Sequence, residues 1–531
     1  MRSIQQPLFT PETEWVPPIN LPDLSQHKEI AIDLETRDPN LMKMGSGSVR
    51  GDGEIVGIAV AVEGWSGYFP IAHEGGGNMD RALVLDWFEE VLHTTATKIF
   101  HNAMYDVSWI RSLGFYINGG IIDTMIAASL IDENRFSYTL DSVGKDYISM
   151  RKNESLLKEA AKDFGVNPKA EMWRLPAPFV GEYAEKDAEI TLKLWHALQH
   201  EISKQDLWDV FNLETNLFPC LVDMKFKGVR VDLNRAETLK KTLLLSEQQQ
   251  RLDMREFVDF DVEIWAAQSV AKAFDKCGIT FPKTKNGSPS FTKLFLQEHD
   301  HPLAQLVTQA RNLNKTSGTF INTIMKHCHA DGRIHSHINQ IRSDDGGTVS
   351  GRISMSNPNL QQIPARDPEL GPMIRSLFLP EEDEQWAAID FSQQEPRILV
   401  HYAQIFGKWK SRPLGGAQEF VDAYNDDADT DFHTMVAEMA QIPRKQAKVV
   451  NLGMMYGMGV NKLADQLDVD VDTAKELTKQ YHNRVPFVKE LMNGVSRAVD
   501  QKDDGSIRSL KGRKCRFDMF EPLGYELKKA L

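Results

Sequence analysis

Apolar residues recur along the chain in two spacings, and the spacing changes from one region to the next. In the N-terminal third, short runs and alternation typical of β-strands are followed by the 3–4-residue spacing of amphipathic helices. The pattern predicts strands over 28–36, 54–62, 66–71 and 98–100, and helices over 80–92, from 103 onward and over 181–203. A hairpin of strands followed by alternating helices and strands indicates a mixed α/β domain.

The remainder of the chain has a different pattern. Residues 207–326 are mostly helical in spacing, with interruptions at 225–231 and at the Pro- and Gly-containing loop 282–289. Short strands and helices mix from residue 332 onward. Within that region, residues 386–390 form an apolar run that ends in an aspartate, and we predict a buried strand there. The fold class is therefore α/β (α+β), with more than one domain.

Composition narrows the class of protein. The chain has 531 residues, 41% hydrophobic and 26% charged, which is typical of a globular protein. Its 61 Lys and Arg against 75 Asp and Glu give a net charge of −14, so any nucleic acid must be held in a confined basic groove rather than by bulk charge. Four scattered cysteines predict reduced thiols in a cytoplasm. No apolar run approaches the ~18 residues of a membrane span, so we expect no membrane association.

Carboxylates gather in the predicted N-terminal domain. Asp33 and Glu35 are two residues apart on a strand and share one side of it. Asp106 lies just after another strand, and Tyr183 and Asp187 are four residues apart on one helix face. Neighbouring ionised carboxylates repel one another unless a cation lies between them, and Mg²⁺ prefers such oxygen ligands. Alone, each of these groups is also typical of ordinary surface residues.

A second set lies in the C-terminal half. Asp390 ends the predicted strand 386–390. Further along, Arg444, Lys448, Leu452 and Tyr456 recur every four residues after Pro443 and form a gently spiralling stripe on one helix face. Cations beside an aromatic ring suit a nucleoside triphosphate, whose phosphates need charge and whose base needs a flat surface.

The first set resembles the three motifs of the DEDDy 3′→5′ exonucleases. Asp33 and Glu35, Asn102-x-x-x-Asp106 and Tyr183-x-x-x-Asp187 occur in that family's order. The resemblance implies a ribonuclease-H-like fold in which two Mg²⁺ ions are held by carboxylates, with Mn²⁺ able to substitute. It implies that Asp33, Glu35, Asp106 and Asp187 are metal ligands and that Tyr183 orients the attacking water. All five would be catalytic residues.

The second set resembles family A DNA polymerases, especially those of phages. The motifs are Asp390-Phe391-Ser392-Gln393-Gln394-Glu395 and the Arg444–Tyr456 stripe. The resemblance implies that Asp390 is a catalytic metal ligand and that Glu395 excludes a ribose 2′-OH. It places a deoxynucleoside triphosphate (dNTP) against Gln393, Glu395, His433, Arg444, Lys448, Leu452 and Tyr456. It places a DNA primer–template against Arg352, Gln361, Arg508, Lys511 and Arg513. Two residues depart from the family's usual pattern. Leu452 stands where many members have Phe or Tyr, and Pro396 stands where Leu is commoner.

The resemblance also implies a domain order. We expect an irregular arm over 1–27, the exonuclease domain over 28–205, palm entry and helical thumb over 206–345, and part of the palm with the fingers over 346–531. The His-Asp-Glu motif that supplies the second metal-binding Asp of the polymerase site (motif C) does not occur in this last region. A second polypeptide that supplies the motif and an incomplete gene product both fit this pattern.

Together these features predict a DNA-directed DNA polymerase with a proofreading 3′→5′ exonuclease, located in the cytoplasm (the host's, for a phage protein). We expect the exonuclease to be intact and polymerisation to need the missing part. One alternative is a 3′→5′ DNA exonuclease whose C-terminal half only holds DNA. Another is an RNA-trimming exonuclease, against which Asp390, Glu395 and the Arg444–Tyr456 stripe argue because such an enzyme has no role for them.

Overall fold

The computed structural model describes residues 12–517 except 285, 345, 366, 441, 468, 502 and 503. Of the arm predicted over 1–27, residues 12–27 are described. Residues 1–11 and 518–531 lie outside the described residues. The chain divides into two compact units. Unit 1 comprises Met1–Ile131 and Arg135–Gln385, and unit 2 comprises Asp132–Asn134 and Trp386–Leu531. None of the described helices combines the length and apolar character that crossing a bilayer requires.

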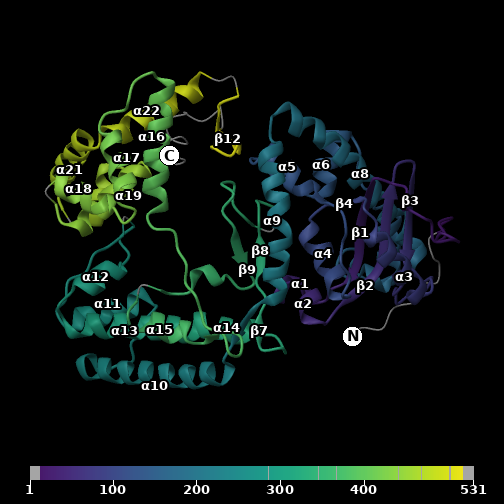
Figure 1. The fold of residues 1–531 in the computed structure, drawn as a ribbon. Helices are drawn as coiled ribbons and strands as arrows, with labels where there is room; N and C mark the ends of the chain where they lie inside the picture. The colour runs from purple at the N-terminus through teal and green to yellow at the C-terminus, as the bar shows by residue number, and fades with distance from the viewer. Residues whose placement is uncertain are drawn as a thin grey trace. The chain divides into compact units, whose positions relative to one another are not determined.

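A five-stranded sheet is the centre of the first part of unit 1 (Figure 1). Its strand order is β3-β2-β1-β4-β5, with β1 antiparallel to β2 and parallel to β4. The strands are β1 (Glu29–Arg37), β2 (Glu54–Val62), β3 (Trp65–Pro70), β4 (Thr97–Phe100) and β5 (Ile121–Asp123). The first four agree with the predicted strands to within one residue at nearly every end, because alternation and turn residues are strong local signals.

Helices cover both faces of this sheet. One face packs against α3 (Arg81–His93) and α4 (Ala103–Ser112) through the apolar side chains of Ile30, Ile32 and Leu34. The opposite face packs against α8 (Gly181–Lys204), and α5 (Thr124–Ile131), α6 (Leu140–Ile148) and α7 (Ser155–Phe164) complete the same apolar core. Ala31 belongs to that second core, so Asp33 and Glu35, two and four residues on, point to the α8 side of the sheet. Two short helices, α1 (Leu41–Met44) and α2 (Gly47–Arg50), follow β1.

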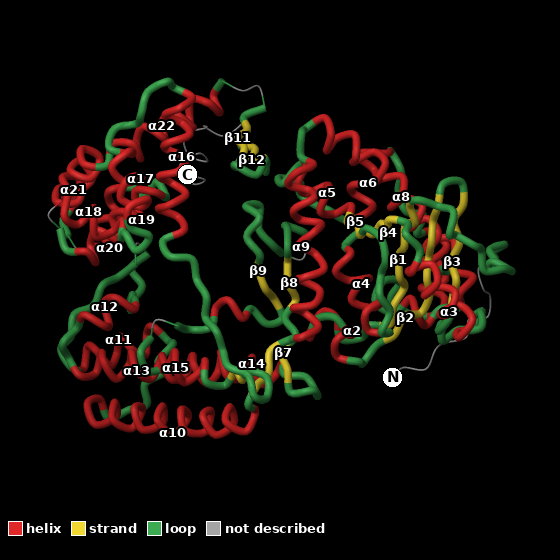
Figure 2. The backbone as a smooth tube through the Cα atoms, in the orientation of Figure 1, coloured by secondary structure: helices red, strands yellow, loops and turns green. Residues whose placement is uncertain are grey.

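The rest of unit 1 is mainly helical, as predicted, with short strands between (Figure 2). Its helices are α9 (Trp208–Lys227), α10 (Leu233–Val258), α11 (Ala267–Lys276), α12 (Lys293–Glu298), α13 (Pro302–Lys315), α14 (Asn322–His327) and α15 (Leu370–Arg375), with a π-helix over Thr316–Ile321. Its strands pair as β10 (Phe378–Leu379), β6 (Val229–Val231) and β7 (Arg333–Ile334) in one sheet, and β8 (His337–Asn339) with β9 (Ser354–Ser356) in another.

The described part of unit 2 is a helical body with one hairpin. Its apolar core is formed by side chains such as Phe420, Phe432 and Phe487, all fully buried. The helices are α16 (Gln394–Trp409), α17 (Ala417–Asp426), α18 (Phe432–Ala440), α19 (Arg444–Met455), α20 (Val460–Leu467), α21 (Val471–Arg484) and α22 (Pro486–Asp500). Strands β11 (Ser506–Arg508) and β12 (Lys514–Arg516) form the hairpin.

The predicted buried strand over 386–390 is wrong. These residues belong to no strand, and the side chains of Trp386, Ile389 and Phe391 are 62%, 94% and 79% exposed. A strand needs a neighbouring strand to accept and donate its backbone hydrogen bonds, and none of the described sheets includes this run. Asp390 therefore follows an exposed extended segment and precedes α16.

Close packing beneath β1 gives a first prediction. Gly57 pairs with Glu35 across β1 and β2, and a Cβ atom at Gly57 would lie 2.1 Å from the Tyr68 hydroxyl oxygen. Tyr68 is fully buried and its hydroxyl is 2.6 Å from Nε2 of His73, so it has no room to move. We expect Gly57→Ala to lower the free energy of unfolding by about 1–3 kcal/mol, the usual cost of overpacking. Chemical denaturation measures this.

Gly120→Ala is the matched control for that variant. A Cβ atom there would meet Thr97 atoms at 3.5 and 3.6 Å, which is ordinary contact. Equal stabilities of the two variants would contradict the packing described for Gly57.

Candidate active sites

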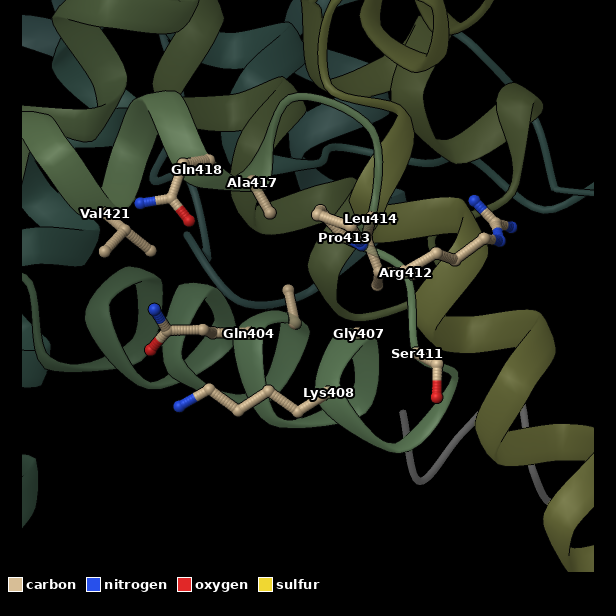
Figure 3. Close-up of a pocket in the computed structure, with 11 residues that line it drawn as sticks. Gln404, Gly407, Lys408, Ser411, Arg412, Pro413, Leu414, Ala417, Gln418 and Val421 are labelled. Carbon is tan, nitrogen blue, oxygen red and sulfur yellow. The ribbon is translucent and has the colours of Figure 1, made fainter.

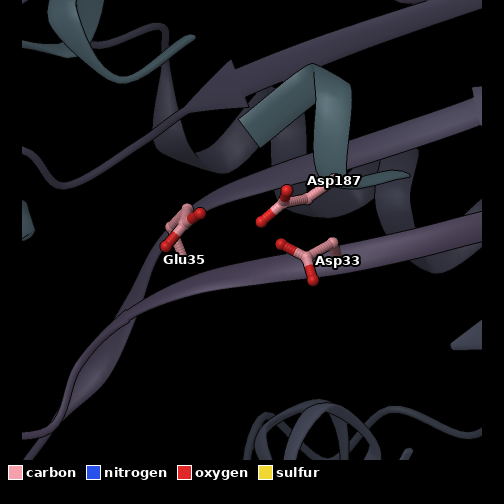
Figure 4. Close-up of side chains that lie close together, drawn as sticks. All are labelled: Asp33, Glu35 and Asp187. Atoms are coloured by element: carbon pink, nitrogen blue, oxygen red, sulfur yellow. The ribbon is translucent and has the colours of Figure 1, made fainter. Parts of the chain in front are cut away.

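Three carboxylates converge at the α8 face of the sheet. Asp33 and Glu35 extend from β1, and Asp187 reaches them from α8 (Figure 4). Ligand oxygens of all three lie within 4.8 Å of one another. Among the residues that the structure describes, no other group of three His, Cys, Asp or Glu side chains is as close. The arrangement follows from the alternation of β1 and from α8 packing across β1, β2 and β3.

Asp106 lies beside the same strand. It occupies the first turn of α4, and one of its oxygens accepts a hydrogen bond from the backbone N–H of Leu34 at 3.2 Å. The charge of Asp33 raises the pKa of Asp106, in addition to the larger effect of burial. Asp106 is thus beside the cluster of Asp33, Glu35 and Asp187 without being part of it.

Asp123 holds the start of α4 in place, and the sequence analysis missed it. Its carboxylate accepts hydrogen bonds from the backbone N–H groups of Asn102 (3.0 Å), Ala103 (2.9 Å) and Met125 (2.8 Å). Burial nevertheless raises its pKa to about 6. The signal available in the sequence was an aspartate directly between a short strand and a helix, a position where a side chain can satisfy free N–H groups.

Burial is the largest influence on the electrostatics of the cluster, and repulsion between its carboxylates adds to it for Asp33 and Glu35. Burial and then the charge of Asp187 raise the pKa of Asp33 to about 7. Burial, followed by the charges of Asp33 and Asp187, raises the pKa of Glu35 well above its ordinary value. Burial also raises the pKa of Asp187, and one of its oxygens, Oδ1, is buried without a hydrogen-bond partner. This set of oxygens fits a hard divalent cation such as Mg²⁺.

Lys152 is the second residue that the sequence analysis missed. Its ammonium group forms an ion pair with Oδ2 of Asp187 and donates to the Tyr183 hydroxyl at 3.1 Å. It also lies 5.0 Å from the centre of the Tyr183 ring. Lys152 belongs to the irregular segment between α6 and α7, so no periodic pattern pointed to it.

A polar groove adjoins the carboxylates. One part is lined by Asp33, His101, Asn102 and Lys152, and a second part by Arg151, Lys152, Lys158, Lys169 and Tyr183 among others. Thr139, Leu140 and Lys152 line both parts, which makes them neighbours. The second part is rich in cations, although Lys158 is paired with Glu154 at 2.6 Å.

Unit 2 brings most of the predicted nucleotide-binding residues together at helix ends. The hydroxyl of Tyr456, at the end of α19, donates to a carboxylate oxygen of Glu395, in the first turn of α16. Gln393 has a left-handed backbone (φ 51°), and its side chain accepts from the N–H of Phe432 (2.7 Å) and donates to the carbonyl of Thr430 (2.8 Å). Gln393 therefore ties the start of α16 to the start of α18.

The departure at Pro396 has a simple physical explanation. Pro396 is the third residue of α16, within the first turn. The first N–H groups of a helix have no carbonyl partner inside the helix, so a proline there removes no helical hydrogen bond.

The α19 stripe predicted from the sequence is present. Ala447, Val450 and Met454 face the core, whereas Lys448 and Tyr456 are exposed and Leu452 is half-buried. Arg444 pairs with Asp431 at 2.5 Å. His433 is buried, and its Nδ1 is 2.9 Å from the side-chain amide of Asn451. Burial lowers the pKa of His433. The charge of Asp431 opposes this shift, and the charges of Lys448 and Arg444 add to it.

The predicted DNA-contacting residues fall into two groups. In unit 1, Arg352 and Gln361 are exposed near β9, where the Gln361 amide donates to the carbonyl of Ile353 at 2.9 Å. In unit 2, Arg508, Lys511 and Arg513 lie on or near the turn of the β11–β12 hairpin. Asp390 is exposed and, within the described residues, joins no group of three potential metal ligands.

A pocket in unit 2 lies apart from these residues along the chain. It is formed between α16 and α17 and the loop that joins them, with Gln404, Lys408, Arg412 and Gln418 among the lining side chains (Figure 3). None of the predicted nucleotide-binding residues lines it.

Comparison with known proteins identifies a family for each of the two parts of the chain that carry these sites. Residues 20–203 match the family model described as 3′-5′ exonuclease, and residues 236–529 match the model described as DNA polymerase family A. The second match covers more than half of the chain. This chain belongs to DNA polymerase family A and carries a 3′-5′ exonuclease domain, which makes it a DNA-directed DNA polymerase.

Individual proteins similar to this chain support the same family assignment. The chain is 36% identical to a DNA-directed DNA polymerase of Pseudomonas phage M6, over 97% of this chain and 85% of that protein. It is 30% identical to DNA polymerase DpoZ of Salmonella phage PMBT28, over 93% and 83%. A solved structure, the POL domain of Pol1 from M. smegmatis in complex with DNA primer-template and dNTP, has a similar fold (TM-score 0.73, 21% identity, 95% of this chain and 81% of that chain).

The carboxylate cluster gives a pH prediction. Asp33 has a pKa of about 7 in the folded chain and near 4 when unfolded. The folded state therefore keeps a proton that the unfolded state has lost, and the resulting stability disappears as the pH rises through about 7. With EDTA present, we expect the melting temperature of the chain, relative to that of Asp33→Asn, to fall between pH 5 and pH 8. If the exonuclease domain melts as a unit of roughly 150–250 residues, a relative change of roughly 2–4 °C corresponds to about 1 kcal/mol.

The comparison with Asp33→Asn cancels the titration of groups elsewhere, such as His101. Adding Mg²⁺ at pH 8 should restore the melting temperature of the unaltered chain more than that of the variant. Parallel pH profiles for the two proteins would contradict the repulsion described above.

Proposed function

We propose that unit 1 removes nucleotides from a DNA 3′ end at Asp33, Glu35, Asp106 and Asp187, and that unit 2 adds dNTPs to a primer. The observation that carries the nuclease half is the convergence of three carboxylates from β1 and α8 on one point. The observation that supports the polymerase half is the hydrogen bond between Tyr456 and Glu395, which joins the two motifs proposed to hold the nucleotide.

The nuclease site is suited to Mg²⁺, with Mn²⁺ as a substitute. All four proposed ligands are carboxylates, and Oδ1 of Asp187 is a buried oxygen that still lacks a partner. When bound, two such ions would lower the pKa of the attacking water and stabilise charge on the leaving 3′ oxygen. Closely spaced carboxylates with raised pKa values are the state expected of a ligand set before its cation binds.

The remaining residues of the nuclease site position the substrate. Tyr183 is half-buried beside Asp187 on the same helix face, where its hydroxyl can orient a water for attack on the terminal phosphodiester. Arg151, Lys158 and Lys169 line the adjoining groove and provide positive charge for the phosphates of a single strand.

In the polymerase half, the proposed roles are those that the resemblance to family A DNA polymerases implies. Asp390 is proposed as the metal ligand and Glu395, held by Tyr456, as the residue that excludes a ribose 2′-OH. Arg444, Lys448 and His433 are proposed to hold the triphosphate, while Leu452 and Tyr456 contact the base and sugar. Gln393 acts by fixing the start of α18. Arg352, Gln361, Arg508, Lys511 and Arg513 are proposed to contact the primer–template.

Two-metal nucleotide addition needs a second carboxylate beside Asp390. Within the described residues, Asp390 belongs to no group of three potential metal ligands. We propose that the second carboxylate comes from residues outside those described or from a second polypeptide. Membership in the polymerase family argues against the alternative in which the C-terminal half only holds DNA.

Removing one nuclease ligand tests the first half of the proposal. Asp187→Asn removes a charge from the cluster, so we expect 3′→5′ degradation of a 5′-labelled strand in Mg²⁺ to slow by at least ~100-fold, as expected for loss of a metal ligand. Asp209→Asn, an exposed aspartate at the start of α9, is the control. If Asp187→Asn degraded DNA at the rate of the control, the carboxylate cluster would not be the nuclease site.

Nucleotide binding tests the second half without depending on extension. In the Asp187→Asn background, with Ca²⁺ and a dideoxy-terminated primer–template, we expect Lys448→Gln to weaken binding of the next correct dNTP by about 10-fold, the loss of one phosphate contact. Fluorescence of a labelled template measures the binding. Lys462→Gln removes an exposed lysine from α20 and is the matched control. Equal dNTP affinities in the two variants would refute the role assigned to the α19 stripe.

A further inference from the structure

Lys152 has an unusual position for a cation in a site proposed to bind metal ions. Its ammonium contacts Asp187, one of the three converging carboxylates, and the Tyr183 hydroxyl is 3.1 Å away. Its side chain is only 18% exposed. The ammonium contacts Oδ2 of Asp187, so a divalent ion that takes this oxygen as a tight ligand must displace the ammonium. An ion on Oδ1 alone would still lie beside the positive charge of Lys152, which opposes its binding.

The backbone at Lys152 is fixed although its side chain is long. The Lys152 N–H donates to Oδ1 of Asp141 on α6 at 3.1 Å, and the residue lies between α6 and α7. A four-carbon side chain extending from a fixed backbone can move its ammonium by several ångströms through rotamer changes alone.

Lys152 also lies where the two parts of the groove meet. It lines the part that contains Asp33 and the part that contains Lys158 and Lys169. An ammonium displaced from Asp187 can therefore extend into the groove. A phosphate oxygen of a bound strand would be a suitable partner for the ammonium there.

Resting on the nuclease function proposed above, we propose that Lys152 is a movable cation of that site. Its ammonium neutralises Asp187 while no metal is bound, and it passes to a phosphate oxygen of the 3′-terminal nucleotide when metal ions take the carboxylates. In the first state it competes with the metal, and in the second it holds the substrate. Both consequences can be measured separately.

The first measurement is metal affinity without DNA. Binding of Mn²⁺ is measured by electron paramagnetic resonance in the unaltered chain and in Asp187→Asn. The binding that is present in the first and absent from the second belongs to the carboxylate cluster. At the carboxylate cluster, we expect Lys152→Gln to bind Mn²⁺ at least ~3-fold more tightly than the unaltered chain does, because the competing cation is gone. A merely structural lysine would have the opposite effect, since its loss would loosen the cluster and weaken Mn²⁺ binding.

The second measurement is single-turnover degradation of a 5′-labelled single strand at saturating Mn²⁺. We expect Lys152→Gln to lower the rate constant or the DNA affinity by about 10-fold or more, and Lys152→Arg to recover part of the loss because its charge can still reach a phosphate. Lys158→Gln, which breaks a lysine–glutamate pair in the same groove, should leave Mn²⁺ affinity unchanged.

Two results would overturn the proposal: Mn²⁺ affinity in Lys152→Gln that is unchanged or weaker, or degradation at saturating Mn²⁺ equal to that of the unaltered chain. Circular dichroism of each variant confirms that it is folded. If Asp187→Asn retained both Mn²⁺ binding and degradation, the nuclease assignment itself would fail. If it lost both while Lys152→Gln changed neither, only the role of Lys152 would fail.

Discussion

The repulsion among Asp33, Glu35 and Asp187 is the constraint around which unit 1 is organised. Three carboxylates are brought within 4.8 Å of one another at a largely buried edge between a sheet and a helix. Such an arrangement opposes folding unless cations compensate it. The neighbouring elements hold the carboxylates together in spite of this unfavourable free energy. β1 carries two of them on one face, α8 packs across that face with the third, and Asp123 fixes the start of the helix that carries Asp106. The ion pair between the Lys152 ammonium and Asp187 offsets part of this unfavourable free energy.

Unit 2 is held together differently. Its core is aromatic and aliphatic, and the polar residues of the proposed nucleotide site connect helix ends instead of crowding like charges. Pairing of Arg444 with Asp431, and of His433 with Asn451, satisfies these groups within the unit. The family match explains why both arrangements occur in one chain, since an exonuclease domain and a polymerase domain adjoin in sequence.

Much of the nuclease site could be predicted because its residues obey local periodicities. The two-residue spacing of Asp33 and Glu35 and the four-residue spacing of Tyr183 and Asp187 fix which side of a strand or helix they occupy. Lys152 and Asp123 obey no periodicity, because one lies in an irregular segment and the other between two elements. The strand over 386–390 was wrongly predicted for a related reason: an apolar run favours a strand locally, but pairing depends on a partner that the run itself does not specify.

The side chain of Gln393 has a mechanical consequence. It bonds to the backbone on both sides of the start of α18, while its own backbone makes the left-handed turn between Asp390 and α16. A displacement of α18 would therefore be transmitted through two hydrogen bonds of 2.7–2.8 Å to the turn three residues from Asp390. Movement of α18 and movement of the segment that carries Asp390 are therefore coupled, and one can move without the other only if this amide bridge breaks.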